Sequence, residues 1–481
     1  MQRRFIDRAI ERRTLVDAWE SGRPELVVVH GRRRVGKTEL LARFAAGRAI
    51  AFFVAAQQLA ASQLEDLGRT LGSMSVDFRR GRPPRIALRD WTEALDVVAE
   101  AATRRRVGLV LDEFPYLCDA DSALPSLIQR WWDRTGSRSD VMLVVAGSEQ
   151  AMLQRLTSRD GALYGRPTRS IWLRPFDYLH ASRFVAGWTH EDRVRAYAIA
   201  GGIPDYLEEL SSERPLRDSL RQLAFSPDGR LFREAPDLLR SEFNEPRTYE
   251  SILRAMAAGE HQPSRIATLA GMRSAASAAP YLERLIRLEL VERRTLPTES
   301  SAPRPRISRY VLADPYLRFY FALVDPWRSA ILAGQGARVL DELWPVAVDR
   351  HVSHVFEDVA AQYVRRLSGS AVLPVLETVG KQWLDAGDVD VVGATGGRVV
   401  VAGSAKWSRA FVKPGDLADL RRDVARIAPG SDPELLLFSR SGFDPALRRV
   451  GRVRLVGLAD LFRANLDVER HALDAPEATS R

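Results

Sequence analysis

The sequence predicts an α/β fold whose first part is a parallel β-sheet covered by helices. Residues 26–29 form a wholly apolar run, as expected for a strand buried on both faces of a parallel sheet. This run leads into a glycine-rich loop at residues 31–38 and then into a helical stretch. A second apolar run, residues 107–111, ends in two carboxylates. Buried strands that alternate with helices are typical of parallel α/β sheets.

The glycine-rich loop has the phosphate-binding pattern Gly-x-x-x-x-Gly-Lys-Thr between a strand and a helix, the context that makes the motif specific. In such a loop, successive backbone N–H groups point at an anion, and the helix adds its positive dipole end. Lys37 would reach the β- and γ-phosphates, and Thr38 would ligate Mg²⁺. A surface turn is the alternative. The predicted nucleotide-binding residues are Gly31, Arg32, Arg33, Arg34, Val35, Gly36, Lys37, Thr38 and Glu39.

The two carboxylates after the second apolar run, Asp112 and Glu113, form the pattern called Walker B. Asp112 would hold Mg²⁺ through water, and Glu113 would polarise the attacking water. An acidic pair that caps a helix is the alternative. The position of the pair in a strand–helix alternation after the glycine loop favours catalysis. We therefore expect ATP and Mg²⁺ as ligands, with Glu113 and Lys37 as catalytic residues.

Two further residues are candidates for contacting the γ-phosphate. Ser148 follows the expected strand 141–146, at the tip of a neighbouring strand, and a helix N-cap is an equally good interpretation. Arg166 lies in Leu-Tyr-Gly-Arg-Pro and would act as an arginine finger. In a chain so rich in arginine, a solvated charge is the better default for Arg166.

Composition limits the class of protein. The chain has 481 residues, enough for several domains, and a net charge of +9, which permits a polyanionic partner. No apolar stretch approaches the ~20 residues of a membrane helix. The first residues lack the apolar core of a signal peptide, and one cysteine, Cys118, cannot form an internal disulfide, so we expect a cytoplasmic protein without membrane contact. The only lysines are Lys37, Lys381, Lys406 and Lys413.

A family resemblance rests on stretches spread over about the first 210 residues: Phe5-Ile6-Asp7-Arg8, Gly31 to Thr38, Leu111-Asp112-Glu113-Phe114, Leu163-Tyr164-Gly165-Arg166, Leu173-Arg174-Pro175-Phe176 and Gly201-Gly202-Ile203-Pro204-Asp205-Tyr206-Leu207. They resemble the archaeal-type ATPase family, a branch of the AAA+ and STAND-like P-loop ATPases that also occurs in bacteria. The resemblance implies a helical lid in which Gly202 and Pro204 lie near the adenine. The residues alone indicate only a helix stop followed by a helix that begins with proline.

The middle of the chain predicts a winged helix. Helices are expected at 248–258, 263–270 and 274–289, followed by two strands around a polar tip at 297–306. The third helix would enter a DNA major groove, and arginines on the wing would meet phosphates. A module that packs between domains is the alternative. The candidate DNA contacts are Arg273, Ser274, Arg284, Arg287, Arg304 and Arg306.

The last third begins with an aromatic-rich stretch, residues 314–321, that resembles the domain accompanying archaeal-type ATPases. That domain is similar to the PD-(D/E)xK nucleases, the restriction-endonuclease-like fold. Glu357, Asp390 and Lys406 match its pattern, but Ser404 stands where the pattern has glutamate. A serine hydroxyl is a poor substitute for a carboxylate beside Mg²⁺. We expect a degenerate domain that grips nucleic acid or packs against the ATPase, without nuclease activity.

These observations predict an ATPase core at 1–180, a helical lid and linker at 181–245, a winged helix at 246–313, a nuclease-like α/β domain at 314–466 and a tail at 467–481. We expect an ATP-hydrolysing, nucleotide-driven switch associated with double-stranded DNA. One alternative is a slow or non-hydrolysing regulatory or defence scaffold that binds a protein partner, and a second is an ATP-dependent nuclease. A self-contained switch and a ring-shaped homo-oligomer both fit one chain.

Overall fold

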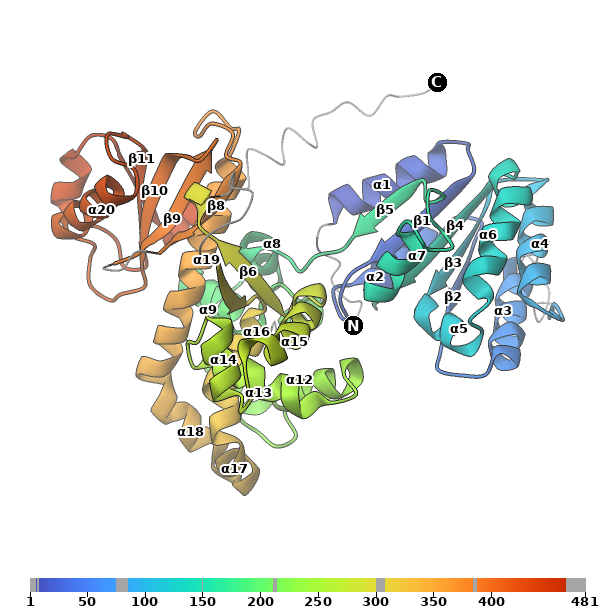
Figure 1. Cartoon of the computed structure of the whole chain (residues 1–481), viewed down its shortest axis with the longest axis horizontal. Helices are drawn as coiled ribbons and strands as arrows, with labels where there is room; N and C mark the ends of the chain where they lie inside the picture. The colour runs from blue at the N-terminus through green and yellow to red at the C-terminus, as the bar shows by residue number, and fades with distance from the viewer. Residues whose placement is uncertain are drawn as a thin grey trace. The chain divides into compact units, whose positions relative to one another are not determined.

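The computed structural model describes residues 6, 8–74, 85–148, 150–210, 214–299, 308–383 and 387–463. The chain divides into two compact units, Met1–Pro175 and Phe176–Arg481, each with its own sheet and its own hydrophobic core (Figure 1). Within the described ranges, no helix is both long enough and apolar enough to cross a membrane.

The first unit is built on a five-stranded parallel sheet with the strand order β2-β3-β4-β1-β5. Helices lie on both of its faces, so β3 and β4 are buried along their whole length (Figure 1). The predicted parallel α/β core is therefore confirmed. The strands are β1 (Glu25–His30), β2 (Ile50–Val54), β3 (Val107–Asp112), β4 (Val141–Gly147) and β5 (Arg169–Trp172).

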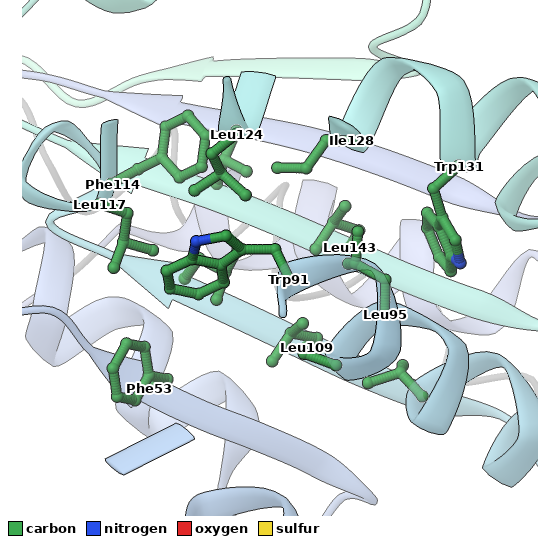
Figure 2. Packing of buried hydrophobic residues seen from close by; sticks show 14 of the residues in the cluster. Phe53, Trp91, Leu95, Leu109, Phe114, Leu117, Leu124, Ile128, Trp131 and Leu143 are labelled. Carbon is green, nitrogen blue, oxygen red and sulfur yellow. The ribbon is translucent and has the colours of Figure 1, made fainter. Parts of the chain in front are cut away.

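Large apolar side chains fill the space between this sheet and the helices on one face. Figure 2 shows Trp91 and Leu95 of α4 beside Leu109 of β3 and Leu143 of β4, with Ile128 of α6 nearby. All five are almost fully buried, which makes this layer a main source of stability for the unit. The helices are α1 (Ala9–Glu20), α2 (Lys37–Ala45), α3 (Ala60–Met74), α4 (Trp91–Ala102), α5 (Phe114–Ala120), α6 (Leu124–Arg134) and α7 (Gln150–Thr157).

The second unit begins with a run of helices and continues with three helices and a two-stranded antiparallel sheet, β6-β7. This is the order of elements predicted for a winged helix. The elements are α8 (Tyr178–Ser182), α9 (His190–Ala200), α10 (Pro204–Leu210), α11 (Leu216–Leu223), α12 (Arg230–Glu242), α13 (Pro246–Ala257), α14 (Pro263–Leu269), α15 (Ala275–Arg287), β6 (Val291–Thr295), the short helix η4 (Pro297–Glu299) and β7 (Ser308–Leu312).

A mixed five-stranded sheet, β12-β11-β10-β9-β8, forms the C-terminal part of the second unit. β10, β11 and β12 are parallel, whereas β9 is antiparallel to both β10 and β8. The helix α19 and the helix α20 both pack on this sheet. The elements are α16 (Pro315–Phe319), α17 (Arg328–Ala330), α18 (Gly336–Leu343), α19 (Asp349–Leu367), β8 (Thr378–Gln382), β9 (Val389–Thr395), β10 (Arg398–Lys406), α20 (Pro414–Ile427), β11 (Glu434–Ser439), β12 (Val453–Gly457) and α21 (Leu458–Arg463).

Polar contacts join the first helices of the second unit to α19. Gln362 accepts a hydrogen bond from the Tyr178 N–H and donates one to the Tyr197 hydroxyl, at 3.0 and 2.9 Å. His351 Nε2, which is buried, donates to the carbonyl of Ala198 at 2.7 Å. These bonds link positions more than 150 residues apart, so α8 and α9 belong to the same compact body as the C-terminal sheet. The domain boundaries expected from the sequence stay predictions.

Candidate functional site

Three neighbouring strands of the first unit end at one edge of the sheet. The register pairs Val29 of β1 with Ala146 of β4, and Val145 of β4 with Leu111 of β3. Because the strands are parallel, the loops that follow them converge at the carboxyl edge, where open α/β sheets bind their ligands. The glycine loop, the carboxylate pair and Ser148 are therefore brought together.

The glycine loop after β1 wraps around the ammonium of Lys37. Lys37 Nζ is buried and donates to the backbone carbonyls of Gly31 and Arg32, at 2.8 and 3.0 Å. Gly31 has no room for a side chain, because a Cβ there would lie 2.3 Å from the carbonyl oxygen of Leu173. Gly36 has φ 93°, in the left-handed region that glycine adopts without strain. The loop conformation thus depends on glycine at both positions.

Thr38 and Asp112 meet across the edge of the sheet. The Thr38 hydroxyl donates to Asp112 Oδ2 at 2.6 Å, and the Asp112 side chain is fully buried. Mg²⁺ prefers hard oxygen ligands, and a hydroxyl beside a carboxylate supplies them. The donor set at this point fits Mg²⁺.

Glu113 begins α5 from an unusual backbone conformation. Its φ of 52° and ψ of 43° lie in the left-handed region, which is rare for a residue other than glycine and occurs often at functional sites. Its N–H donates to Asp112 Oδ1 at 3.0 Å, but its own side chain makes no capping hydrogen bond. Instead, the Ser148 hydroxyl donates to Glu113 Oε2 at 3.3 Å. The Glu113 carboxylate is thus held at the strand edge by a residue from β4's end.

Arg8 is a residue of this site that the sequence interpretation missed as a functional side chain. It is buried, and its Nη2 donates to the carbonyl of Val35 in the glycine loop at 2.9 Å. Arg8 has φ 75° and precedes α1, which begins at Ala9. The only sequence signal was the place of Arg8 in the family resemblance.

Two family models match parts of this chain. Residues 5–210 match the model of an ATPase domain found predominantly in Archaea. The N-terminal part of the chain is therefore similar to this ATPase family. Residues 320–417 match a second model, described as Archaea bacterial proteins of unknown function. The predicted resemblance to archaeal-type ATPases with their accompanying C-terminal domain is confirmed.

Similarity to individual proteins extends over most of the chain. The uncharacterized protein MJECL04 of Methanocaldococcus jannaschii is 28% identical over 425 residues, which are 88% of this chain and 91% of that protein. The Walker-type ATPase PABY2304 of Pyrococcus abyssi is 21% identical, covers 66% of this chain and 96% of its own, and has a TM-score of 0.50. This likeness shows a shared fold. The ORC2 protein of Aeropyrum pernix, solved in ADPNP–ADP complexes, covers 69% and 98% at 16% identity, with a TM-score of 0.42.

Arg166 of the ATPase domain is bound to a carboxylate. Its Nε and Nη2 donate to the two oxygens of Asp133, at 2.9 and 2.8 Å. The hydrogen bonds from Arg166 lower the pKa of Asp133. A guanidinium held by two parallel bonds would have to leave Asp133 before it reached a phosphate. The role of Arg166 as an arginine finger stays a prediction.

Gly202 and Pro204, the predicted lid residues of the ATPase family, belong to the second compact unit. Gly202 packs against the backbone of Phe176, because a Cβ would lie 1.8 Å from the Phe176 carbonyl oxygen, and its own carbonyl accepts the Phe176 N–H at 2.8 Å. Pro204 is the first residue of α10, as expected. Their nearness to adenine stays a prediction.

The candidate DNA contacts concentrate on the helix α15. Arg273 and Arg287 are exposed, Arg284 is half-buried, and none of the three forms an ion pair with any described residue. The Ser274 hydroxyl is used locally, because it accepts the Ser277 N–H at 3.3 Å and caps α15. Arg304 and Arg306 lie outside the described residues.

The structure brings together three of the four residues that resemble a nuclease remnant, and it adds one that the sequence interpretation missed. Ser404 donates to Asp390 Oδ2 at 3.1 Å, and the carboxylate of Glu357 is 2.8 Å from the ammonium of Lys381. Lys406 is exposed at the end of β10, and its side chain has no hydrogen bond or ion pair within the described part of the chain. The only signal for Lys381 was the rarity of lysine.

Proposed function

We propose that the ATPase domain hydrolyses ATP with Mg²⁺ and that the chain works as a nucleotide-driven switch. The observation that best supports hydrolysis is the contact between Thr38 and Asp112 at 2.6 Å, with Glu113 next to it at the same strand edge. Phosphate-binding loop, metal-ligand oxygens and a candidate base are then within one small region, as phosphoryl transfer requires.

Each residue has a distinct role in this proposal. Lys37 exchanges its two carbonyl contacts for phosphate oxygens, which are stronger acceptors for an ammonium. Thr38 and Asp112 would hold Mg²⁺, which would neutralise charge on the phosphates. Glu113 orients the attacking water and accepts its proton, and Ser148 fixes the Glu113 carboxylate.

The hydrolysis proposal is tested by the steady-state rate of phosphate release. Glu113→Gln removes the proton acceptor with little change in shape, so we expect the rate to fall about 100-fold or more while ATP affinity stays within about threefold. Glu100→Gln, an exposed glutamate on α4, is the matched control and should keep the wild-type rate. A Glu113→Gln variant with the wild-type rate would contradict the assignment.

We propose that the switch acts on double-stranded DNA through α15. Arg273, just before α15, and Arg284 and Arg287 on it offer positive charge without carboxylate partners among the residues that the structure describes. This arrangement suits phosphate contact, and the net charge of +9 favours it. Nucleotide state would then change how tightly the second unit holds DNA.

Fluorescence anisotropy with a labelled DNA duplex tests this part of the proposal. Arg284→Ala/Arg287→Ala should weaken binding about tenfold and reduce its salt dependence, because two phosphate contacts are lost. Arg448→Ala/Arg449→Ala, two exposed arginines of the last sheet region, should bind as the wild type does. Equal binding by both double variants and by wild type, with ATP or ADP, would instead favour a protein partner for this face.

A further inference from the structure

Lys381 lies inside the carboxylate cluster of the C-terminal sheet. Its Nζ is 2.8 Å from Glu357 Oε2 on α19, 3.4 Å from Asp388 Oδ2 and 3.8 Å from Asp390 Oδ1 at the start of β9. Lys381 itself comes from the neighbouring strand β8. One ammonium therefore faces three carboxylates that reach it from two other elements.

The ammonium and the carboxylates stabilise each other's charged forms. Burial lowers the pKa of Lys381, but the charges of Glu357, Asp390 and Asp388 outweigh it and raise that pKa overall. Burial raises the pKa of Glu357, and the pull of Lys381 counteracts this only in part. A partly buried carboxylate cluster of this kind needs a cation, and Lys381 supplies one positive charge at its centre.

The far side of the cluster is also occupied by hydrogen-bond donors. Asp390 Oδ2 accepts the Ser404 hydroxyl at 3.1 Å and the Ala405 N–H at 2.9 Å. Ser404, where the nuclease pattern has glutamate, therefore donates to Asp390 in place of offering a further carboxylate. Only one oxygen of Asp390 faces the interior of the cluster.

A divalent metal does not fit among these residues. Mg²⁺ needs near-octahedral oxygen ligands at about 2.1 Å. The point that the carboxylates share is taken by Lys381 Nζ, and a metal placed there would meet the ammonium directly. Among the described residues, no group of three His, Cys, Asp or Glu side chains is arranged to hold a metal ion.

Strand β8, which carries Lys381, is held in place by η4, the short helix that follows β6. β8 is the edge strand of its sheet, and η4 packs on it. The Thr378 hydroxyl of β8 donates to the Pro297 carbonyl at 3.2 Å, and the Thr298 hydroxyl donates to Gln382 at 3.3 Å. These bonds flank Lys381 on both sides along β8, so the ammonium is held at the cluster by contacts independent of the carboxylates.

We propose that Lys381 is the built-in cation of this cluster: it occupies the position that a divalent metal would take, and the cluster becomes a metal site only when another side chain replaces Lys381. The charges of the carboxylate cluster are then balanced without a metal ion, and the domain cannot cleave a phosphodiester by a metal-dependent mechanism. Glu357, Lys381 and Asp388 line a cavity of about 570 Å³, which gives an ion a path to the cluster.

The proposal is tested by measuring how Mn²⁺ binds to the full-length, nucleotide-free protein. Binding is measured as the decrease of the EPR signal of free Mn²⁺. Wild type and Glu357→Gln should bind Mn²⁺ equally weakly. Lys381→Met should gain one site at least about tenfold tighter, since Glu357, Asp388 and Asp390 then lack the ammonium that they share. Adding Glu357→Gln to that variant should remove the gain. Lys406→Met, which changes a lysine on β10 of the same sheet, should behave like wild type.

Two outcomes would overturn the proposal. One is a Mn²⁺ site in wild type that Glu357→Gln destroys, because a metal would then already share the cluster. The other is a folded Lys381→Met variant without any gain. If Lys381→Met does not fold in the absence of metal, recovery of its thermal transition on addition of Mn²⁺ would support the proposal. In that case a Mn²⁺ site in wild type that Glu357→Gln destroys would still overturn it.

Discussion

A lysine lies at the centre of each of the two candidate sites, and the two lysines differ in the charge of the groups that they contact. Lys37 of the ATPase domain donates to two backbone carbonyls, whereas Lys381 of the C-terminal sheet faces three carboxylates. Carbonyls carry partial charge and yield readily to a stronger acceptor; carboxylates carry full charge and do not. The first ammonium is therefore available to an incoming phosphate, and the second is already neutralised.

The carboxylates of the two sites differ in the same way. Asp112 is paired with a neutral hydroxyl, so its charge is available to a metal ion. Glu357 is paired with an ammonium, so its charge is already balanced. The comparison indicates that one site is built to receive charged ligands and that the other holds its own counter-ion.

The largest expected effect concerns the available carboxylate. Asp112→Asn keeps the shape of the side chain but removes its charge, so Mg²⁺ should no longer strengthen ATP binding. We expect the gain in ATP affinity on adding Mg²⁺ to fall roughly tenfold or more, measured by titration calorimetry with and without Mg²⁺. An unchanged gain would show that Asp112 does not serve the metal, and the contrast with Glu357 would disappear.

A second effect concerns acid stability, because the second unit contains a buried imidazole. Burial lowers the pKa of His351 to about 3, so the folded state requires the neutral form. The stability it contributes is present above its unfolded pKa near 6.5 and is lost as the pH falls toward 3. At pH 5 this costs about 2 kcal/mol.

Urea unfolding between pH 8 and pH 4 checks this expectation. His351→Gln keeps a donor for the Ala198 carbonyl but does not titrate, so its stability should depend less on acid. Partial burial also lowers the pKa of His354, the exposed histidine of the same helix α19, so His354→Gln should change the acid dependence less than His351→Gln does. Parallel curves for wild type and His351→Gln would contradict the assigned pKa.

The smallest effect tests whether Arg8 holds the glycine loop in its binding conformation before ATP binds. Arg8→Met keeps much of the aliphatic stem but loses the hydrogen bond to the Val35 carbonyl, worth about 1 kcal/mol. ATP affinity should fall about fivefold, without a change in the Mg²⁺ dependence. No loss of affinity in calorimetry would mean that the loop keeps its shape without Arg8.

Much of the fold followed from local patterns in the chain. The strand before the glycine loop and the strand that ends at Asp112 were predicted because both are short, apolar and followed by functional residues. The union of α8 and α9 with α19 was not predictable, since it depends on bonds such as that between Gln362 and Tyr178, 184 positions apart. No local periodicity reports such a contact.

The candidate site shows the same division. Gly31 to Thr38 is one continuous motif, so its residues were identified directly, and the Walker B pair followed from its place after a strand. Arg8 stood out only as part of a stretch that resembles the family, and Lys381 belongs to no motif. Each acquires its role through contacts with residues far along the chain. Lys406 was predicted as a site residue because it matches the nuclease pattern, but its side chain forms no hydrogen bond or ion pair within the described residues.

The central contrast between the two lysines is tested most directly by calorimetric titration of Mg²⁺ and ATP into three proteins. Lys37→Ala should lose at least about 100-fold in ATP affinity, because charge-assisted bonds to phosphate are removed. Lys381→Ala should bind ATP as tightly as wild type does, provided that its thermal transition shows it to be folded. A Lys37→Ala variant with full affinity, or an equal loss in both variants, would contradict the account.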